Sequence, residues 1–304
     1  MIKNSKLFMK FSVFLILIAA FGLCMLLSDY SLTQVYAAFP TPVASGTKVQ
    51  KADRAEIDYS NAADGYVMVK YTATTDKSVR VKIQGPGGVD DQYRLSTNGQ
   101  WDVFPLINNG AYTVSVFEQV QPNDNKYASV VSANVDVKLS SEFAPYLRPN
   151  QFVNFNANSK CVQAAAGLVG GDVITTVGNV YNWVIDNITY DKVLAQNVQS
   201  GYVPNLDAVF TSKKGICFDY SSLMTAMLRS QGIPTRLVIG YAGDAYHAWI
   251  SVHSDKTGWI NNVIQFDGTN WKLMDATFAA TGNQTADVMK YIGDGSNYNP
   301  TAYH

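Results

Sequence analysis

The 304-residue sequence has few of the residues that build metal centres and disulfide frameworks. It contains three cysteines and three histidines, and no two cysteines stand at the spacing of a zinc site. A calcium-loop pattern is also missing, so we expect no metal and no cofactor. Charged residues make up only 15% of the chain and the net charge is -1, which argues against a nucleic-acid partner. Hydrophobic residues, at 47%, are too frequent for a disordered chain.

Residues 1–38 predict a secretory signal peptide. Three lysines precede an apolar run over residues 11–27, and a small-residue cleavage pattern follows at 35–37. The run is at the lower edge of the length that spans a membrane, so an uncleaved N-terminal anchor is the alternative. In both cases we expect the rest of the chain outside the cytoplasm, secreted or at the cell surface. Membrane contact is then expected only through this segment, if it stays uncleaved.

Residues 39–53 predict a linker and residues 54–140 a small β-sandwich domain. Apolar residues recur with period two in several short runs, and glycine- or asparagine-rich turns separate them. The predicted strands lie at 66–71, 79–83, 111–117 and 131–137. This spacing favours a sandwich of the immunoglobulin-like type. The segment contains neither cysteine nor histidine, so we expect a spacer or a binding module without chemistry of its own.

Residues 141–304 predict an α+β domain. Apolar residues at three- and four-residue steps from 173 to 188 indicate an amphipathic helix, with Asp172 as its N-cap. A second helix is expected over 217–230, because glycine and proline follow it in the usual order. The strands expected after these helices lie at 235–241, 247–253, 263–266 and 271–275. Helices followed by antiparallel strands are typical of an α+β fold.

Cys217 is the candidate nucleophile. It opens the second predicted helix and follows Lys213, Lys214 and Gly215. A helix N-terminus and nearby positive charge both favour a thiolate, the reactive form of cysteine. The free backbone N–H at this position could also donate to a developing oxyanion. The alternative is a cysteine that is merely a small residue of the core.

His247 and Asp275 are the candidate partners of this thiol. In the predicted strand, His247 lies on the face opposite Ala248 and Ile250, so we expect it to point away from the core. Its rival His253 lies next to a turn, where we expect it to be solvated. Asp275 ends the last predicted strand and could accept the other ring N–H of the histidine. A structural cap at the strand end is the alternative for Asp275.

Four segments of the sequence resemble the transglutaminase-like superfamily. They are NITYD at 187–191, KKGICFDYSSL at 213–223, YHAWI at 246–250 and WKLMDATF at 271–278. The exit from the second helix, at 228–236, is also similar. The order Cys, His, Asp and separations of about 30 residues agree with the family, over about a third of the chain. One departure is Ala276, where many members have proline.

The resemblance implies a papain-like fold and a cysteine enzyme. Cys217 would be the nucleophile, His247 its base and Asp275 the residue that orients the histidine. The reaction would be thiolate attack on an amide, followed by transfer of the acyl group to water or to an amine. The implied substrate is a protein or peptide, with cell-wall peptide as one class. Trp183 is a candidate for the second oxyanion donor, and a core residue is its alternative.

Two further alternatives stay open. A disulfide between Cys161 and Cys217 would leave no free thiol in the mature protein. The α+β domain could instead be a non-catalytic binding or assembly module at the cell surface. Neither the choice between water and amine nor the oligomeric state follows from the sequence.

Overall fold

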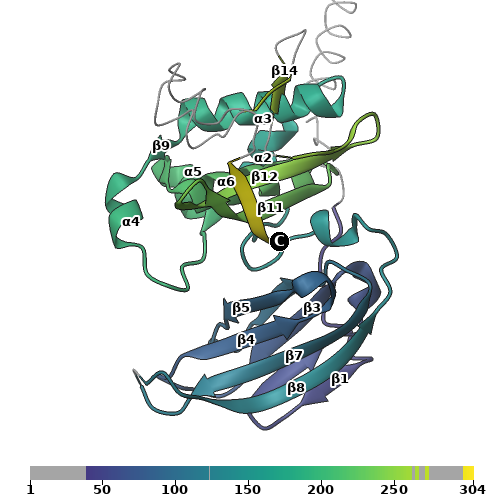
Figure 1. Cartoon of the computed structure of the whole chain (residues 1–304), viewed down its shortest axis with the longest axis vertical. Helices are drawn as coiled ribbons and strands as arrows, with labels where there is room; N and C mark the ends of the chain where they lie inside the picture. Colours follow the sequence, from purple (N-terminus) through teal and green to yellow (C-terminus); the bar gives the residue numbers. More distant parts are fainter. Residues whose placement is uncertain (1–38, 123, 262–263, 267–270, 274–296) are drawn as a thin grey trace, which may run out of the picture. The chain divides into compact units, whose positions relative to one another are not determined.

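The computed structural model describes residues 39–304 apart from 123, 262–263, 267–270 and 274–296. Residues 36–304 form one compact unit. Within it, a part made of strands is followed along the chain by a part of mixed helices and strands (Figure 1). Among the described residues, no helix combines the length and hydropathy that crossing a membrane requires.

Two four-stranded antiparallel sheets share one apolar core in the first part (Figure 1). One sheet has the order β1-β2-β3-β6, with β1 Val49–Lys51, β2 Ala55–Asp58, β3 Tyr66–Tyr71 and β6 Trp101–Pro105. The other has the order β5-β4-β7-β8, with β5 Asp90–Arg94, β4 Val79–Gln84, β7 Gly110–Gln119 and β8 Tyr127–Val137. The 3-10 helices η1 Ala62–Asp64 and η2 Pro86–Gly88 lie between strands. The four predicted strands are confirmed, and the immunoglobulin-like type and the domain limits stay predictions.

Strand β5 is absent from the sequence-based expectations. Its residues are mostly polar, and only Tyr93 is buried. Because β5 is the edge of its sheet and pairs with β4 alone, it needs little apolar surface. A strand of this kind has no alternating apolar pattern that could predict it.

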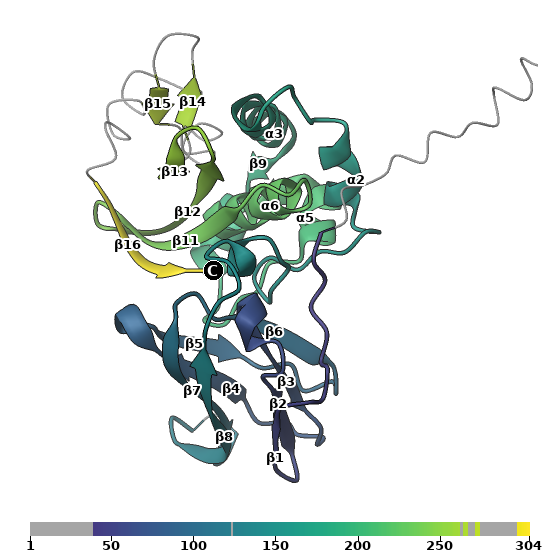
Figure 2. The ribbon, with the colours of Figure 1, turned by 90° about the vertical axis from the view of Figure 1, so that its right-hand side faces the viewer.

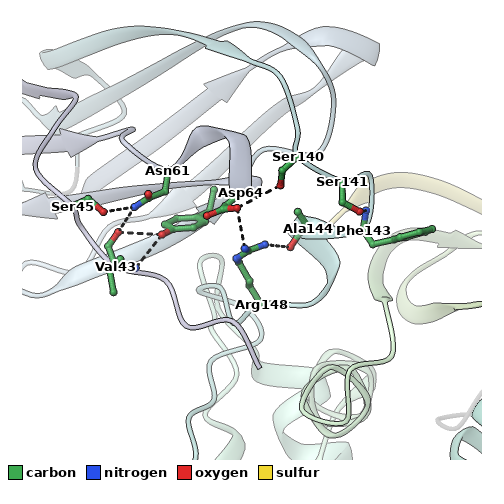
Figure 3. Close-up of polar contacts among 10 residues, drawn as sticks. Val43, Ser45, Asn61, Asp64, Ser140, Ser141, Phe143, Ala144 and Arg148 are labelled. Atoms are coloured by element: carbon green, nitrogen blue, oxygen red, sulfur yellow. Dashed lines mark hydrogen bonds and ion pairs between the residues drawn. The ribbon is translucent and has the colours of Figure 1, made fainter. Parts of the chain in front are cut away.

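The segment expected as a linker is fixed on the sandwich. It contains strand β1, and Asn61 Nδ2 donates to the Val43 carbonyl at 2.9 Å and to Ser45 Oγ at 2.7 Å (Figure 3). After the last strand of the sandwich, Arg148 pairs with Asp64 at 3.2 Å and donates to the Ala144 carbonyl (Figure 3). The stretch that follows β8 is therefore tied back to the sandwich before the helices begin.

The second part contains five α-helices among its described residues. They are α2 Lys160–Ala166, α3 Val173–Asn187, α4 Lys192–Asn197, α5 Leu206–Ser212 and α6 Cys217–Arg229, with the 3-10 helix η3 Ala144–Tyr146 ahead of them. The predicted N-cap of α3 is confirmed, because the Asp172 carboxylate accepts the Thr175 N–H at 2.8 Å. Helix α6 begins at the residue where the sequence predicted it.

A four-stranded antiparallel sheet of order β13-β12-β11-β16 accompanies the helices. Its strands are β13 Gly258–Ile260, β12 Ala245–Ser254, β11 Thr235–Ala242 and β16 Tyr298–Tyr303. Two short pairs complete the part: β9 Thr189–Tyr190 beside β10 Lys214–Gly215, and β14 Ile264–Phe266 beside β15 Trp271–Leu273. The strands predicted at 235–241 and 247–253 and the hairpin of the last two strands are confirmed.

Helix α6 is the centre of this part. It contacts β11 and β12 of the sheet and helices α2, α3 and α5 (Figure 2). Side chains from all of these elements form one apolar core. The buried positions on α6 run without a break from Asp219 to Arg229. Packing along the whole of α6 therefore fixes the position of its first residue, Cys217.

The face of β12 that carries His247 is covered as well, contrary to the expectation that it points away from the core. Trp249 is buried on that face together with Val238, Ala242 and Tyr298, which form a second, smaller apolar cluster. His247 itself is only 6% exposed. The alternation of β12 was therefore predicted correctly, but both of its faces are buried.

Candidate active site

Cys217 is the first residue of α6 and is half-buried. The helix start is fixed by Asp219, whose carboxylate accepts the Ile216 N–H at 2.8 Å and the Tyr202 hydroxyl at 2.8 Å. Asp219 is completely buried, and burial raises its pKa, although the bonds from Ile216 and Tyr202 act in the opposite direction. One buried carboxylate therefore holds both the residue before Cys217 and the loop that contains Tyr202.

Gly215 permits this close arrangement. A Cβ atom built on Gly215 would lie 2.6 Å from the Cβ of Asp219, nearer than real side chains approach. The sequence predicted that this glycine lets a neighbouring chain or a substrate come near the backbone; the group that comes near is the Asp219 side chain. Gly215 also pairs with Tyr190 in the register of β10 and β9. The strand pair therefore brings Tyr190 close to the nucleophile position.

Lys213 has a different role from the one expected of it. It ends α5 in the left-handed conformation, with φ of 58°, and its Nζ lies 4.5 Å and 4.1 Å from the ring centroids of Trp183 and Phe210. Desolvation on these rings lowers the pKa of Lys213. Trp183 stacks on Phe210 at 5.1 Å. Neither Lys213 nor Trp183 lines the cavity that contains Cys217, and the packing of Trp183 on Phe210 and Lys213 favours the core-residue alternative for Trp183.

His247 comes to the site on β12, where it pairs with Gly240 of β11. The next residue, Ala248, accepts a hydrogen bond from Ser221 Oγ at 2.9 Å. Ser221 lies four residues after Cys217 and hence on the same face of α6. This bond joins the helix face that carries Cys217 to the strand segment that carries His247.

Cys217 and His247 line one cavity of about 470 Å³. Its wall also includes Tyr190, segment 198–203 with Tyr202, and residues 92–94 of β5. This volume lies within the roughly 300–1,000 Å³ of typical ligand sites. Burial raises the pKa of Tyr190, and the neighbouring Cys217 adds to the effect. The sequence motifs located the cysteine and the histidine, but the contributions of Tyr202 and of β5 depend on tertiary contacts and were missed.

Asp275 lies outside the described residues, so its role in orienting His247 stays a prediction. Strand β15 ends two residues before it. The rival histidine, His253, is packed against Phe143 at 4.3 Å and Trp259 at 5.4 Å between ring centroids. The expectation that His253 is solvated is therefore wrong, and it does not line the cavity.

The two cysteines of the described residues, Cys161 and Cys217, do not form a disulfide. Cys161 and Cys217 are both free thiols, so the alternative of a disulfide between them is wrong. Cys161 is fully buried in α2, and burial raises the pKa of its thiol to about 12. Within the described ranges, no group of three or more His, Cys, Asp or Glu side chains is arranged to hold a metal ion.

Comparison with known proteins identifies part of the chain. The family model described as the transglutaminase-like superfamily matches residues 163–262. UPF0252 protein MJ1282 of Methanocaldococcus jannaschii is 33% identical over 103 residues, which are 30% of this chain and 29% of that protein. Uncharacterized protein YebA of Bacillus subtilis is 29% identical over 100 residues, which are 27% of this chain and 13% of that protein. The matched part thus spans less than a third of the length of either relative.

Solved structures give weaker similarities. The periplasmic domain of TgpA from Pseudomonas aeruginosa is 14% identical, with 82% of this chain and 80% of that chain covered at a TM-score of 0.34. A structure described as a TGase is 21% identical, with 39% of this chain and 30% of that chain covered at a TM-score of 0.29. At these TM-scores neither similarity supports an inference about fold or function.

Proposed function

We propose that this chain is a cysteine enzyme that acts on amide bonds through a thioester acyl-enzyme, because residues 163–262 match the transglutaminase-like superfamily. One observation carries the proposal. Cys217 and His247, 30 residues apart and on different elements, line the same cavity. A helix start, a histidine and a cavity of ligand size together supply what nucleophilic catalysis by cysteine requires.

In the first step, His247 takes the thiol proton and the Cys217 sulfur attacks the amide carbonyl carbon. The Cys217 backbone N–H, which has no partner within the first turn of a helix, donates to the resulting oxyanion. His247 then returns the proton to the leaving amine as the C–N bond breaks, and a thioester remains. Asp275 is proposed to hold the imidazole in the tautomer that this transfer needs.

In the second step, water or an amine attacks the thioester while His247 takes the proton of the incoming group. The C–S bond then breaks, and the Cys217 sulfur recovers its proton from the histidine. Water gives hydrolysis, as in a peptidase or amidase, and an amine gives a crosslink. We propose a protein or peptide substrate, with cell-wall peptide included. Incubation with a peptide library, with and without an added amine, distinguishes the two outcomes by the mass of the product.

Labelling of thiols by iodoacetamide at neutral pH tests the proposal. We expect the full-length protein to be labelled rapidly at Cys217, Cys217→Ala to lose this label, and His247→Ala to react at least about tenfold more slowly. Cys161→Ala is the matched control and should keep the rapid label, because Cys161 is buried away from the cavity. A rate for Cys217 no greater than that of a free thiol would favour the non-catalytic binding module.

The pattern of residues 1–38 supports export as part of the proposal. The enzyme would then work outside the cytoplasm, secreted or held at the cell surface by an uncleaved N-terminal segment. Expression in a secreting host, followed by mass analysis of the protein from the medium and from the membrane fraction, shows whether the segment is removed. A protein that stays in the cytoplasm would overturn the proposal of export.

A further inference from the structure

The cavity wall has an unbalanced charge. Of the described residues that line it, Arg94 is the one lysine or arginine, and none is aspartate or glutamate. The closest acidic group of the nucleophile helix, Asp219, is completely buried and bonded to Ile216 and Tyr202. A guanidinium in a ligand-sized cavity attracts anionic groups.

Arg94 comes from the sandwich and not from the part with the transglutaminase-like match. It is the last residue of the edge strand β5, in which the neighbouring Tyr93 is buried and also lines the cavity. The Tyr93 hydroxyl lies 3.1 Å from His304 Nδ1, and its ring lies 5.2 Å from that of Phe152. Residues outside the sandwich thus hold β5 at the cavity, where Gln92, Tyr93 and Arg94 all form part of the wall.

The backbone of Arg94 is held by a hydrogen bond, and its exposed side chain extends past Gly201. Its carbonyl accepts a hydrogen bond from Gln151 Nε2 at 2.6 Å. A Cβ atom built on Gly201 would lie 3.5 Å from Arg94 Cδ, so the aliphatic stem reaches the loop on another side of the cavity. Among the described residues, no carboxylate lies within ion-pair distance of its guanidinium. The guanidinium is therefore available to a ligand.

We infer that Arg94 is a specificity-determining residue that binds a carboxylate of the substrate next to the amide that Cys217 attacks. This inference rests on the proposed function and narrows it to acidic peptides. A guanidinium and a carboxylate form two parallel charge-assisted hydrogen bonds, which orient a substrate as well as attract it. The sandwich would then be part of the substrate site, which favours the binding module over the spacer, the two roles that its sequence left open.

A pair of small probes tests the inference without a known substrate. Iodoacetate and iodoacetamide alkylate the same thiol and differ in that only the first has a carboxylate. We measure both rates at Cys217 by peptide mapping of the full-length protein. Arg94→Gln should lower the iodoacetate rate roughly three- to tenfold while the iodoacetamide rate changes less than about twofold. Arg94→Lys should keep most of the iodoacetate rate, and added salt should reduce the difference.

Arg80→Gln is the matched control. Arg80 is exposed, pairs with Arg94 across β4 and β5, and stacks on Tyr127 at 4.8 Å, but it does not line the cavity. It removes the same charge from a neighbouring position. An equal loss of iodoacetate rate in Arg80→Gln and Arg94→Gln would show that the overall positive charge of this region attracts the reagent, and it would overturn the inference.

The outcomes separate this inference from the proposed function. Slow labelling of Cys217 by both reagents would contradict the proposed function itself. Rapid labelling by iodoacetamide, with the same ratio of the two rates in wild type and Arg94→Gln, would overturn only the role of Arg94. A change in the ratio that is confined to Arg94→Gln would support it.

Peptides identify the source of the carboxylate. One neutral peptide amide carries a single glutamate, and a second peptide carries its carboxylate at the C-terminus. Each is tested for protection of Cys217 against iodoacetamide. The effective peptide should require a several-fold higher concentration with Arg94→Gln, and unchanged protection by both peptides would overturn the inference.

Discussion

Two helices in the described part of this protein have a cysteine in their first turn, and only one of these cysteines has the surroundings of a nucleophile. Cys161 is the second residue of α2, and Cys217 is the first residue of α6. Cys161 is fully buried, and its pKa is raised to about 12, first by burial and then by the charge of Asp207. Cys217 is half-buried and shares a cavity with His247.

The comparison shows what a helix N-terminus contributes by itself. Both cysteines lie near the positive end of a helix, so that feature cannot explain the difference between them. The difference comes from access and from neighbours. At α6, Asp219 and Gly215 fix the turn that presents the sulfur to the cavity, and β12 supplies a histidine. At α2, the apolar core surrounds the thiol.

Replacing each cysteine by serine should give opposite results, and this is the largest effect that we expect. Cys217→Ser should lower amide hydrolysis by at least about 10³-fold with little change in stability, because serine is a poor nucleophile without strong activation. Cys161→Ser should lower the free energy of unfolding by about 1–3 kcal/mol, because it buries a hydroxyl in an apolar core. Hydrolysis assays and denaturant titrations of both variants measure the contrast.

The Cys161→Ser protein that remains folded should hydrolyse the substrate at the wild-type rate. Loss of activity in Cys161→Ser without loss of stability would show that Cys161, and not Cys217, is the nucleophile.

Glycines next to the two helices offer a second contrast. Gly215→Ala places a Cβ atom 2.6 Å from Asp219, so we expect a loss of stability of about 1–3 kcal/mol and of activity of about tenfold or more. Gly167 follows α2 at an ordinary φ of -78°, and the nearest atom to an added Cβ is 3.6 Å away. Gly167→Ala should therefore change neither property, and equal losses in both variants would contradict the role given to Gly215.

The sequence was sufficient to locate the elements that carry the site. The start of α6, the alternation of β12 and the N-cap of α3 all follow from local patterns, which is why they were predicted correctly. Cys217 and His247 came from short motifs in a fixed order. Both residues line one cavity, and their catalytic roles stay predictions.

Other parts of the site depend on contacts between distant segments. The bond between Tyr202 and Asp219 joins a loop to a buried carboxylate, and no pattern in either segment predicts the partner. Arg94 belongs to an edge strand without apolar alternation, so neither the strand nor its place at the cavity could be predicted. Lys213 was misassigned because proximity in sequence to Cys217 did not show that its ammonium lies on aromatic rings.

The raised pKa of Cys161 predicts a dependence of stability on alkaline pH. The folded thiol has a pKa of about 12, whereas the unfolded thiol titrates near its ordinary value of 9.0. Stability is therefore complete below the unfolded pKa and is lost as the pH rises toward the folded pKa. Compared with Cys161→Ala, wild type should lose about 1 kcal/mol of additional stability between pH 8 and pH 10.

Denaturant titrations of both proteins at several pH values measure this difference. Subtracting the Cys161→Ala curve removes the contributions of the tyrosines, which the two proteins share. Parallel curves between pH 8 and pH 10 would show that the pKa of the Cys161 thiol is not raised. The contrast between Cys161 and Cys217 would then rest on burial and neighbours alone.

The smallest effect concerns the bond that links α6 to β12; α2 is instead joined at its start to α5, where the Lys160 N–H donates to Asp207 at 3.0 Å. Ser221→Ala removes the donor to the Ala248 carbonyl and should cost about 1 kcal/mol of stability. Ser230→Ala removes a buried bond to Met227 within the end of the same helix and should cost a similar amount. Only Ser221→Ala should also lower hydrolysis, by a few-fold, because the strand that carries His247 loses a fixed point beside Cys217. Equal activity in the two variants, measured at matched folded fraction, would show that packing alone positions the histidine.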